Sequence, residues 1–182
     1  MVFSKIKKKA AEVRTHDSDM VASSTSLEHP FEWALHLCQS LAFFFHGILG
    51  MTEPFTGCLR ATFKDNGAMP SWFWPVAGII LWVVAAANFS PNDSIVLAAQ
   101  AYIASFHMGG FFYHLRLGHH PIVGCAPAVF AVFAFIITSI RTNLIVGAIG
   151  FVVCTFIAFL LSRVLVKPPV EEDGQNSRLL QE

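Results

Sequence analysis

The stretch Ser94–Pro121, SIVLAAQAYIASFHMGGFFYHLRLGHHP, decides the fold class of this protein. It contains no Asp, Glu, Lys or Arg between Ile95 and Leu115. A helix needs about 20 apolar residues to cross the hydrocarbon core of a bilayer. This run therefore predicts a membrane-spanning helix, and it ends in a basic turn that is rich in histidine.

Three polar residues recur along this predicted helix. Gln100, His107 and His114 are spaced seven residues apart, and seven residues fall within about 20° of two full helical turns. Their side chains should therefore form one stripe. Polar groups within a membrane are costly when they face lipid, so we expect this stripe to face other helices or a wet cavity.

A second polar stripe lies near the start of the chain. Steps of three and four residues place the following side chains on one helical face: His36, Gln39, Ser40, Phe43, His46 and Gly47. We expect the two stripes to face each other. The candidate cofactor-binding residues are therefore His36, His46, Gln100, His107 and His114.

The composition supports a membrane protein. Of the 182 residues, 54% are hydrophobic and 13% are charged, whereas soluble domains are about 25% charged. The net charge is zero and the basic residues form no patch, which argues against nucleic acid as a partner. The four cysteines form no CxxC pair, so we expect neither a disulfide framework nor a metal site.

We predict an all-α, polytopic helical bundle with a four-helix core and a fifth C-terminal span. Residues 1–30 should be a disordered, polar and basic tail, residues 31–166 the transmembrane bundle, and residues 167–182 a polar tail. The predicted spans cover residues 31–51, 72–89, 94–115, 122–140 and 144–166. Breaker residues fill the loop 52–71, in which LRATF could form one short turn. Which membrane holds the bundle, and in which orientation, stays open.

Two charged residues sit at the ends of predicted spans. Glu53 follows the first span and Arg116 follows the third, so both should lie on the same side of the membrane. They are candidates for a structural ion pair. The neighbouring His119 and His120 are expected to be a solvated turn, because adjacent residues project in different directions.

The residues from Phe44 to Arg141 resemble the DoxX-like family of small multi-span membrane proteins. The resemblance rests on HGILGMTEPF, on GIILWVVAAANFSP, on HMGGFFYHLRLGHHP and on PAVFAVFAFIITSIRT. Its most specific part is a pair of glycines followed by an aromatic-His-Leu-Arg run, here Gly109, Gly110 and then Tyr113–Arg116. The resemblance implies a compact four-helix membrane bundle.

This chain departs from the family pattern in two ways. Many relatives carry a lysine three residues after the glycine that closes the first span, where this chain has Gly50 after Gly47. The fifth span is also an addition. The family implies no single activity: some members resemble subunits of thiosulfate:quinone oxidoreductase, others accessory proteins of redox complexes, and an animal branch receptor-assembly chaperones.

Two functions remain in competition. We expect a non-catalytic accessory or assembly subunit of a membrane complex, whose partners are the lipid bilayer and other membrane helices, with a homo-oligomer left open. The alternative is a subunit of a redox complex that binds quinone or haem through its intramembrane histidines, because paired histidines on facing helices are how a bundle holds haem. The sequence contains no catalytic triad, P-loop or dinucleotide fingerprint, so an enzyme is not the expected class.

Overall fold

The computed structural model describes residues 30–63 and 68–167. Both predicted tails, apart from Pro30 and Lys167, lie outside the described residues. The chain divides into two units, Met1–Ala34 and Leu35–Glu182. The packing described below concerns the second unit.

Every regular element in the described part of the chain is a helix. The six helices are α2 (Pro30–Thr56), α3 (Cys58–Phe63), α4 (Phe73–Ala87), α5 (Asp93–Arg116), α6 (Pro121–Arg141) and α7 (Leu144–Leu165). The predicted all-α class is thereby confirmed.

Four of these helices are long and apolar enough to cross a membrane. They are α2, α5, α6 and α7, and they match four of the five predicted spans. The predicted span 72–89 is helical only over the 15 residues of α4. A helix of that length rises about 22 Å, which is less than the hydrocarbon core of about 30 Å. Length and composition therefore support four candidate spans.

The end of the first predicted span differs from the expectation. The first predicted span was expected to end at residue 51, but α2 continues to Thr56. It ends at Gly57, whose positive φ of 60° is a conformation that glycine adopts without strain. The LRATF segment in the following loop belongs to the short helix α3.

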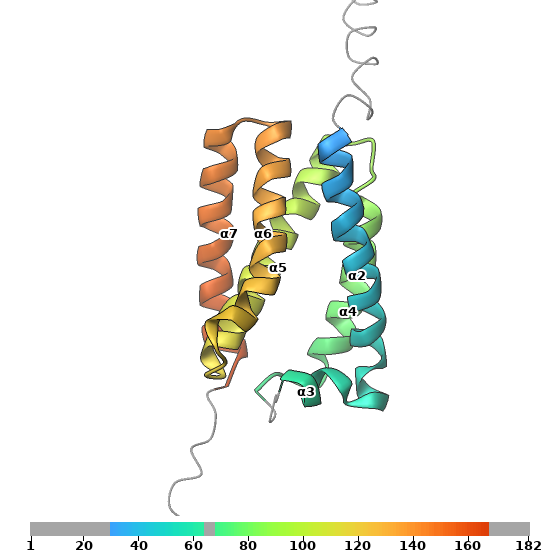
Figure 1. The fold of residues 1–182 in the computed structure, drawn as a ribbon, viewed down its shortest axis with the longest axis vertical. Helices are drawn as coiled ribbons and strands as arrows, with labels where there is room; N and C mark the ends of the chain where they lie inside the picture. The colour runs from blue at the N-terminus through green and yellow to red at the C-terminus, as the bar shows by residue number, and fades with distance from the viewer. Residues whose placement is uncertain (1–29, 64–67, 168–182) are drawn as a thin grey trace, which may run out of the picture. The chain divides into compact units, whose positions relative to one another are not determined.

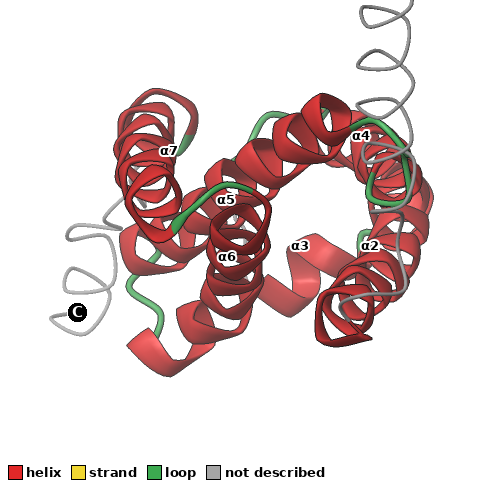
Figure 2. Ribbon diagram, turned by 90° about the horizontal axis from the view of Figure 1, so that it is seen from above, coloured by secondary structure: helices red, strands yellow, loops and turns green. Residues whose placement is uncertain are grey.

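The helix α5 lies at the centre of the second unit. It packs against α4, α6 and α7, and its Gln100 side chain is hydrogen-bonded to Gln39 of α2. Figure 1 shows α5 crossing between the α2–α4 pair and the α6–α7 pair, and Figure 2 shows the same order from above. The stretch that dominates the sequence is thus also the helix that every other long helix contacts.

Glycines bring α2 and α4 into close contact. A Cβ atom on Gly78 would lie 2.6 Å from the carbonyl oxygen of Gly47, and one on Gly50 would lie 2.7 Å from the carbonyl oxygen of Trp74. The indole nitrogen of Trp82 donates a hydrogen bond of 3.0 Å to the carbonyl of Phe44. Gly47 and Gly50 therefore act as packing residues within α2, which explains why the helix does not end at them.

Candidate ligand-binding cavity

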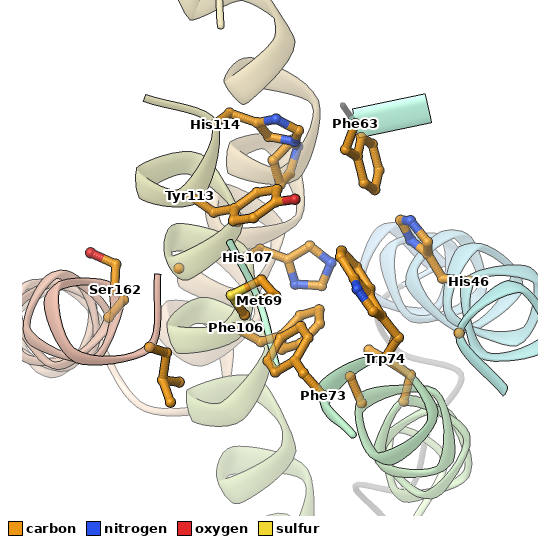
Figure 3. A pocket seen from close by; sticks show the side chains of 18 of the residues that line it. His46, Phe63, Met69, Phe73, Trp74, Phe106, His107, Tyr113, His114 and Ser162 are labelled. Atoms are coloured by element: carbon orange, nitrogen blue, oxygen red, sulfur yellow. The ribbon is translucent and has the colours of Figure 1, made fainter. Parts of the chain in front are cut away.

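A cavity of about 530 Å³ opens between the helices of the second unit. All six helices contribute to its lining, with α4 and α5 contributing the most residues. Most of the lining side chains are aromatic or aliphatic, and no Asp, Glu, Lys or Arg is among the described residues that line it. Figure 3 shows the polar side chains that remain, chiefly histidines, set among aromatic rings. The cavity suits an apolar molecule with few polar groups.

His107 of α5 is the most deeply buried polar side chain of the cavity. It is 2% exposed, and its ring is held between the rings of Phe43, Phe106 and Phe130, with centroid distances of 5.0, 5.3 and 5.2 Å. Its Nδ1 atom lies 2.9 Å from the carbonyl oxygen of Ile103, one helical turn earlier. Its Nε2 atom is buried and has no hydrogen-bond partner within the described residues.

Trp74 of α4 contributes a second unsatisfied polar group. Its indole Nε1 is buried without a hydrogen-bond partner among the residues that the structure describes, and the side chain lines the cavity. Its ring packs on Phe63 and Phe73, with centroids 5.9 and 5.3 Å away. An indole N–H can only donate, so the cavity presents one donor from α4.

His114 lies two helical turns after His107 on α5 and also lines the cavity. Its Nδ1 atom is 2.9 Å from Nδ1 of His119, and the Phe63 ring packs edge-on against it at 5.1 Å. His119 and His120 were expected to be a solvated turn. His120 is exposed, and its side chain accepts a hydrogen bond from the N–H of Ile122 at the start of α6. His119 is half-buried and pairs with His114.

His46 of α2 lines the cavity from the opposite side, as Figure 3 shows. Its side chain is also exposed on the surface of the second unit. The structure thus brings His46, His107 and His114 to one cavity, as expected for stripes on α2 and α5 that face each other.

Gln100 and His36 lie elsewhere. Gln100 is fully buried and is not among the residues that line the cavity. It exchanges hydrogen bonds of 3.2 Å with Gln39 of α2 and donates one of 2.9 Å to Asn88 at the end of α4. Asn88 in turn donates to Gln39 and to Ser40. These four residues form an amide cluster that joins α2, α4 and α5, and its groups are satisfied without a ligand.

His36 is also buried, at 4% exposure, and its ring lies 6.3 Å from the ring of Phe89. It does not line the cavity. Of the five predicted cofactor-binding residues, three therefore line the cavity, Gln100 belongs to the amide cluster, and His36 lies beside Phe89.

Glu53 and Arg116 have different partners in the described part of the chain. The two carboxylate oxygens of Glu53 accept hydrogen bonds from the backbone N–H groups of Leu59 and Arg60, at 2.6 and 3.0 Å. Arg116 donates to the carbonyl oxygen of Ser162 at 2.7 Å. Glu53 thus caps α3, and Arg116 joins the end of α5 to α7. The structure does not bring the two predicted partners together.

Most of the lining residues were not predicted as site residues, among them Trp74, Phe63 and Met69. Trp74 lies in a predicted span, and Phe63 and Met69 were assigned to a loop. The signal available for Trp74 was the pair of small residues three and four positions later, Ala77 and Gly78, which lie on the same helical face and are buried.

Comparison of the chain with protein-family models, curated proteins and solved structures found no match. The resemblance to the DoxX-like family therefore rests on the sequence motifs alone. Within the described residues, no group of three or more His, Cys, Asp or Glu side chains is placed to hold a metal ion.

Proposed function

We propose that this protein is a DoxX-like, multi-pass integral membrane subunit that holds a small ring-shaped ligand of the quinone class in the cavity. The observation that carries this proposal is a pair of buried nitrogens, on His107 and Trp74, which line a largely apolar cavity and have no hydrogen-bond partner within the described residues. Buried polar groups are normally hydrogen-bonded. A ligand that supplies the missing partners would explain both.

The ring of a quinone-class ligand matches the aromatic lining and the indole donor of Trp74. The flat ring would pack against the aromatic side chains, and a ring oxygen would accept a hydrogen bond from the indole N–H of Trp74. A haem matches less well, because the described lining contains no Lys or Arg to pair with its two propionates, and a buried charge without a partner is costly.

We favour an accessory subunit over an enzyme. Most of the described lining is apolar, which is typical of a site that binds and orients a ligand. Binding a ligand for a partner protein in the same membrane is the simplest role for such a cavity.

Five crossings belong to the same proposal. One end of α4 packs on Gly50 of α2, and its other end is hydrogen-bonded to Gln39 through Asn88. The helix α4 therefore runs antiparallel to α2, from the contact at Gly50 to the contact at Gln39. α4 thereby returns the chain to the end of the bundle from which α5 starts, and this course supports a fifth crossing. Turns at Ser71–Trp72 and at Asn88–Phe89 extend the short helix at both ends.

The test is titration of the protein in lipid nanodiscs with a short-chain benzoquinone, followed by tryptophan fluorescence. We expect quenching that saturates in the wild type. Ala77→Phe places a phenyl ring in the cavity and should abolish the saturable part, whereas Ala86→Phe, at an exposed position of the same helix, should not. Unsaturable quenching in the wild type, or equal binding by Ala77→Phe, would contradict the proposal. A Soret band in the purified protein would instead indicate haem.

A further inference from the structure

The hydrogen bond of His107 fixes which of its ring nitrogens carries the proton. Nδ1 lies 2.9 Å from the carbonyl oxygen of Ile103. A carbonyl oxygen can only accept a hydrogen bond, so Nδ1 must be the donor. In a neutral imidazole the other nitrogen, Nε2, is then a bare acceptor.

The surroundings favour the neutral ring. His107 is 2% exposed and is enclosed by Phe43, Phe106 and Phe130. No carboxylate is among the described residues that line the cavity. A charged imidazolium would be buried there without a counter-ion, which is unfavourable.

The acceptor on Nε2 is not satisfied by the protein. This atom is buried and has no partner within the described residues. The Ser162 hydroxyl, another polar group of the lining, donates to the carbonyl of Phe159 instead. His114 is hydrogen-bonded to His119. The indole N–H of Trp74 is a donor in the same lining, but it is not hydrogen-bonded to Nε2. A ligand that partners Nε2 therefore has to supply a hydrogen-bond donor.

We infer that the cavity selects the hydroxyl-bearing, reduced form of its ligand, a quinol in preference to the quinone, through the Nε2 acceptor of His107. This inference rests on the proposed function. A quinone has only carbonyl oxygens, which would face the Nε2 lone pair without a proton between them. A quinol hydroxyl donates to Nε2, and its oxygen still accepts from Trp74.

Selection of one redox form has a thermodynamic consequence. A quinone takes up two electrons and two protons to become the quinol, and tighter binding of the quinol raises the midpoint potential of the bound couple. For a two-electron couple each tenfold preference corresponds to about 30 mV. Satisfying one buried hydrogen-bonding group typically changes an equilibrium by roughly ten- to a hundredfold. The bound couple should therefore be shifted upward by about 30–60 mV.

The experiment compares three ligands under anaerobic conditions: trimethylbenzoquinone, its quinol, and the dimethyl ether of that quinol. The ether has the same ring but no hydroxyl donor. Binding to Ala77→Phe gives the background of partition into lipid. We expect the wild type to bind the quinol at least tenfold more tightly than the quinone or the ether, and His107→Phe to bind all three alike.

Each outcome separates the two proposals. If the wild type binds none of the three ligands above background, the proposed function fails, and this inference with it. If it binds quinone and quinol equally, the inference fails while the proposed function stands. A preference that survives in His107→Phe would overturn the assignment to His107. If that variant does not fold, the comparison of quinol with ether in the wild type still decides whether a hydroxyl is selected.

Discussion

Phe43 of α2 stacks on His107 of α5, with ring centroids 5.0 Å apart and an interplanar angle of 28°. Phe43 is fully buried and also contacts Phe130 of α6, at 5.7 Å. The orientation of the His107 ring is therefore determined by three helices. The direction in which Nε2 points depends on α2 and α6 as much as on α5.

The variant Phe43→Leu tests this dependence. It keeps an apolar side chain but removes the stacking contact, which contributes about 0.5–1.5 kcal/mol beyond the buried area. We expect a lower thermal midpoint and a smaller difference between quinol and ether binding, because the ring of His107 is less constrained. The control is Phe45→Leu, at a position of α2 that is 62% exposed. An unchanged ligand preference in Phe43→Leu would show that the Ile103 hydrogen bond alone orients the ring.

The contact between α2 and α4 predicts a severe effect at Gly78. Its added Cβ would lie 2.6 Å from the carbonyl oxygen of Gly47 and 2.9 Å from the backbone nitrogen of Met51. Backbone atoms cannot move aside as a flexible side chain can. Gly78→Ala should therefore destabilise the protein by about 1–3 kcal/mol.

The matched control for Gly78→Ala is Gly150→Ala in α7, where an added Cβ has nothing within 4 Å. Alanine is the better helix former by about 1 kcal/mol, so this variant should be as stable as the wild type or more so. Thermal unfolding in detergent compares the two. Equal loss of stability in both variants would contradict close packing at Gly78.

The polar stripes were predictable from the sequence, because residue spacing within one helix determines which side chains share a face. The seven-residue spacing of Gln100, His107 and His114 placed all three on one face, and each of them is buried in the structure. The separation of this stripe into a cavity and an amide cluster was not predictable. It depends on Asn88, which lies at the end of another helix and satisfies Gln100.

The loop 52–71 was the least predictable region. Its charged and breaker residues indicated turns, yet α2 extends into it and α3 forms inside it. The reason is Glu53, whose carboxylate accepts two backbone N–H groups from α3. This pairing links the end of one helix to the start of the next, and no periodicity within a single helix predicts it. The sequence pattern therefore suggested Arg116 as the partner of Glu53 instead.

Gln100→Leu separates the amide cluster from the cavity. Removing this amide leaves Gln39 and Asn88 with fewer partners in a buried site. Side-chain hydrogen bonds between membrane helices average about 0.6 kcal/mol and reach about 1.7 kcal/mol, so we expect a loss of about 1–2 kcal/mol. Saturable quinone binding should persist, because Gln100 does not line the cavity. Loss of binding in a variant that still folds would place Gln100 at the ligand.

Replacing Gln39 together with Gln100 refines the same prediction. The double variant Gln39→Leu/Gln100→Leu removes both members of the reciprocal pair. Replacing two hydrogen-bonded partners by apolar groups can be nearly neutral, whereas removing one leaves the other unsatisfied. The double variant should therefore be less destabilised than the sum of its single variants. Strict additivity would show that the two amides do not stabilise each other.

Glu53→Ala tests how α3 is held at the cavity. Leu59 and Phe63 of α3 line the cavity, and the carboxylate of Glu53 is 4% exposed and accepts the N–H groups of Leu59 and Arg60. Loss of a cap typically costs about 0.5–2 kcal/mol. Hydrogen exchange should therefore accelerate at these two amides, and quinone binding should weaken.

The control for Glu53→Ala is Thr52→Ala, because the Thr52 hydroxyl donates to carbonyl groups of its own helix, those of Ile48 and Leu49. Glu53→Gln should be intermediate, since a side-chain amide offers one acceptor oxygen where the carboxylate offers two. The capping role would be contradicted if amide hydrogen exchange at Leu59 and Arg60 were as slow in Glu53→Ala as in the wild type. Weaker quinone binding without faster exchange would mean that Glu53 acts on the cavity by a route other than α3.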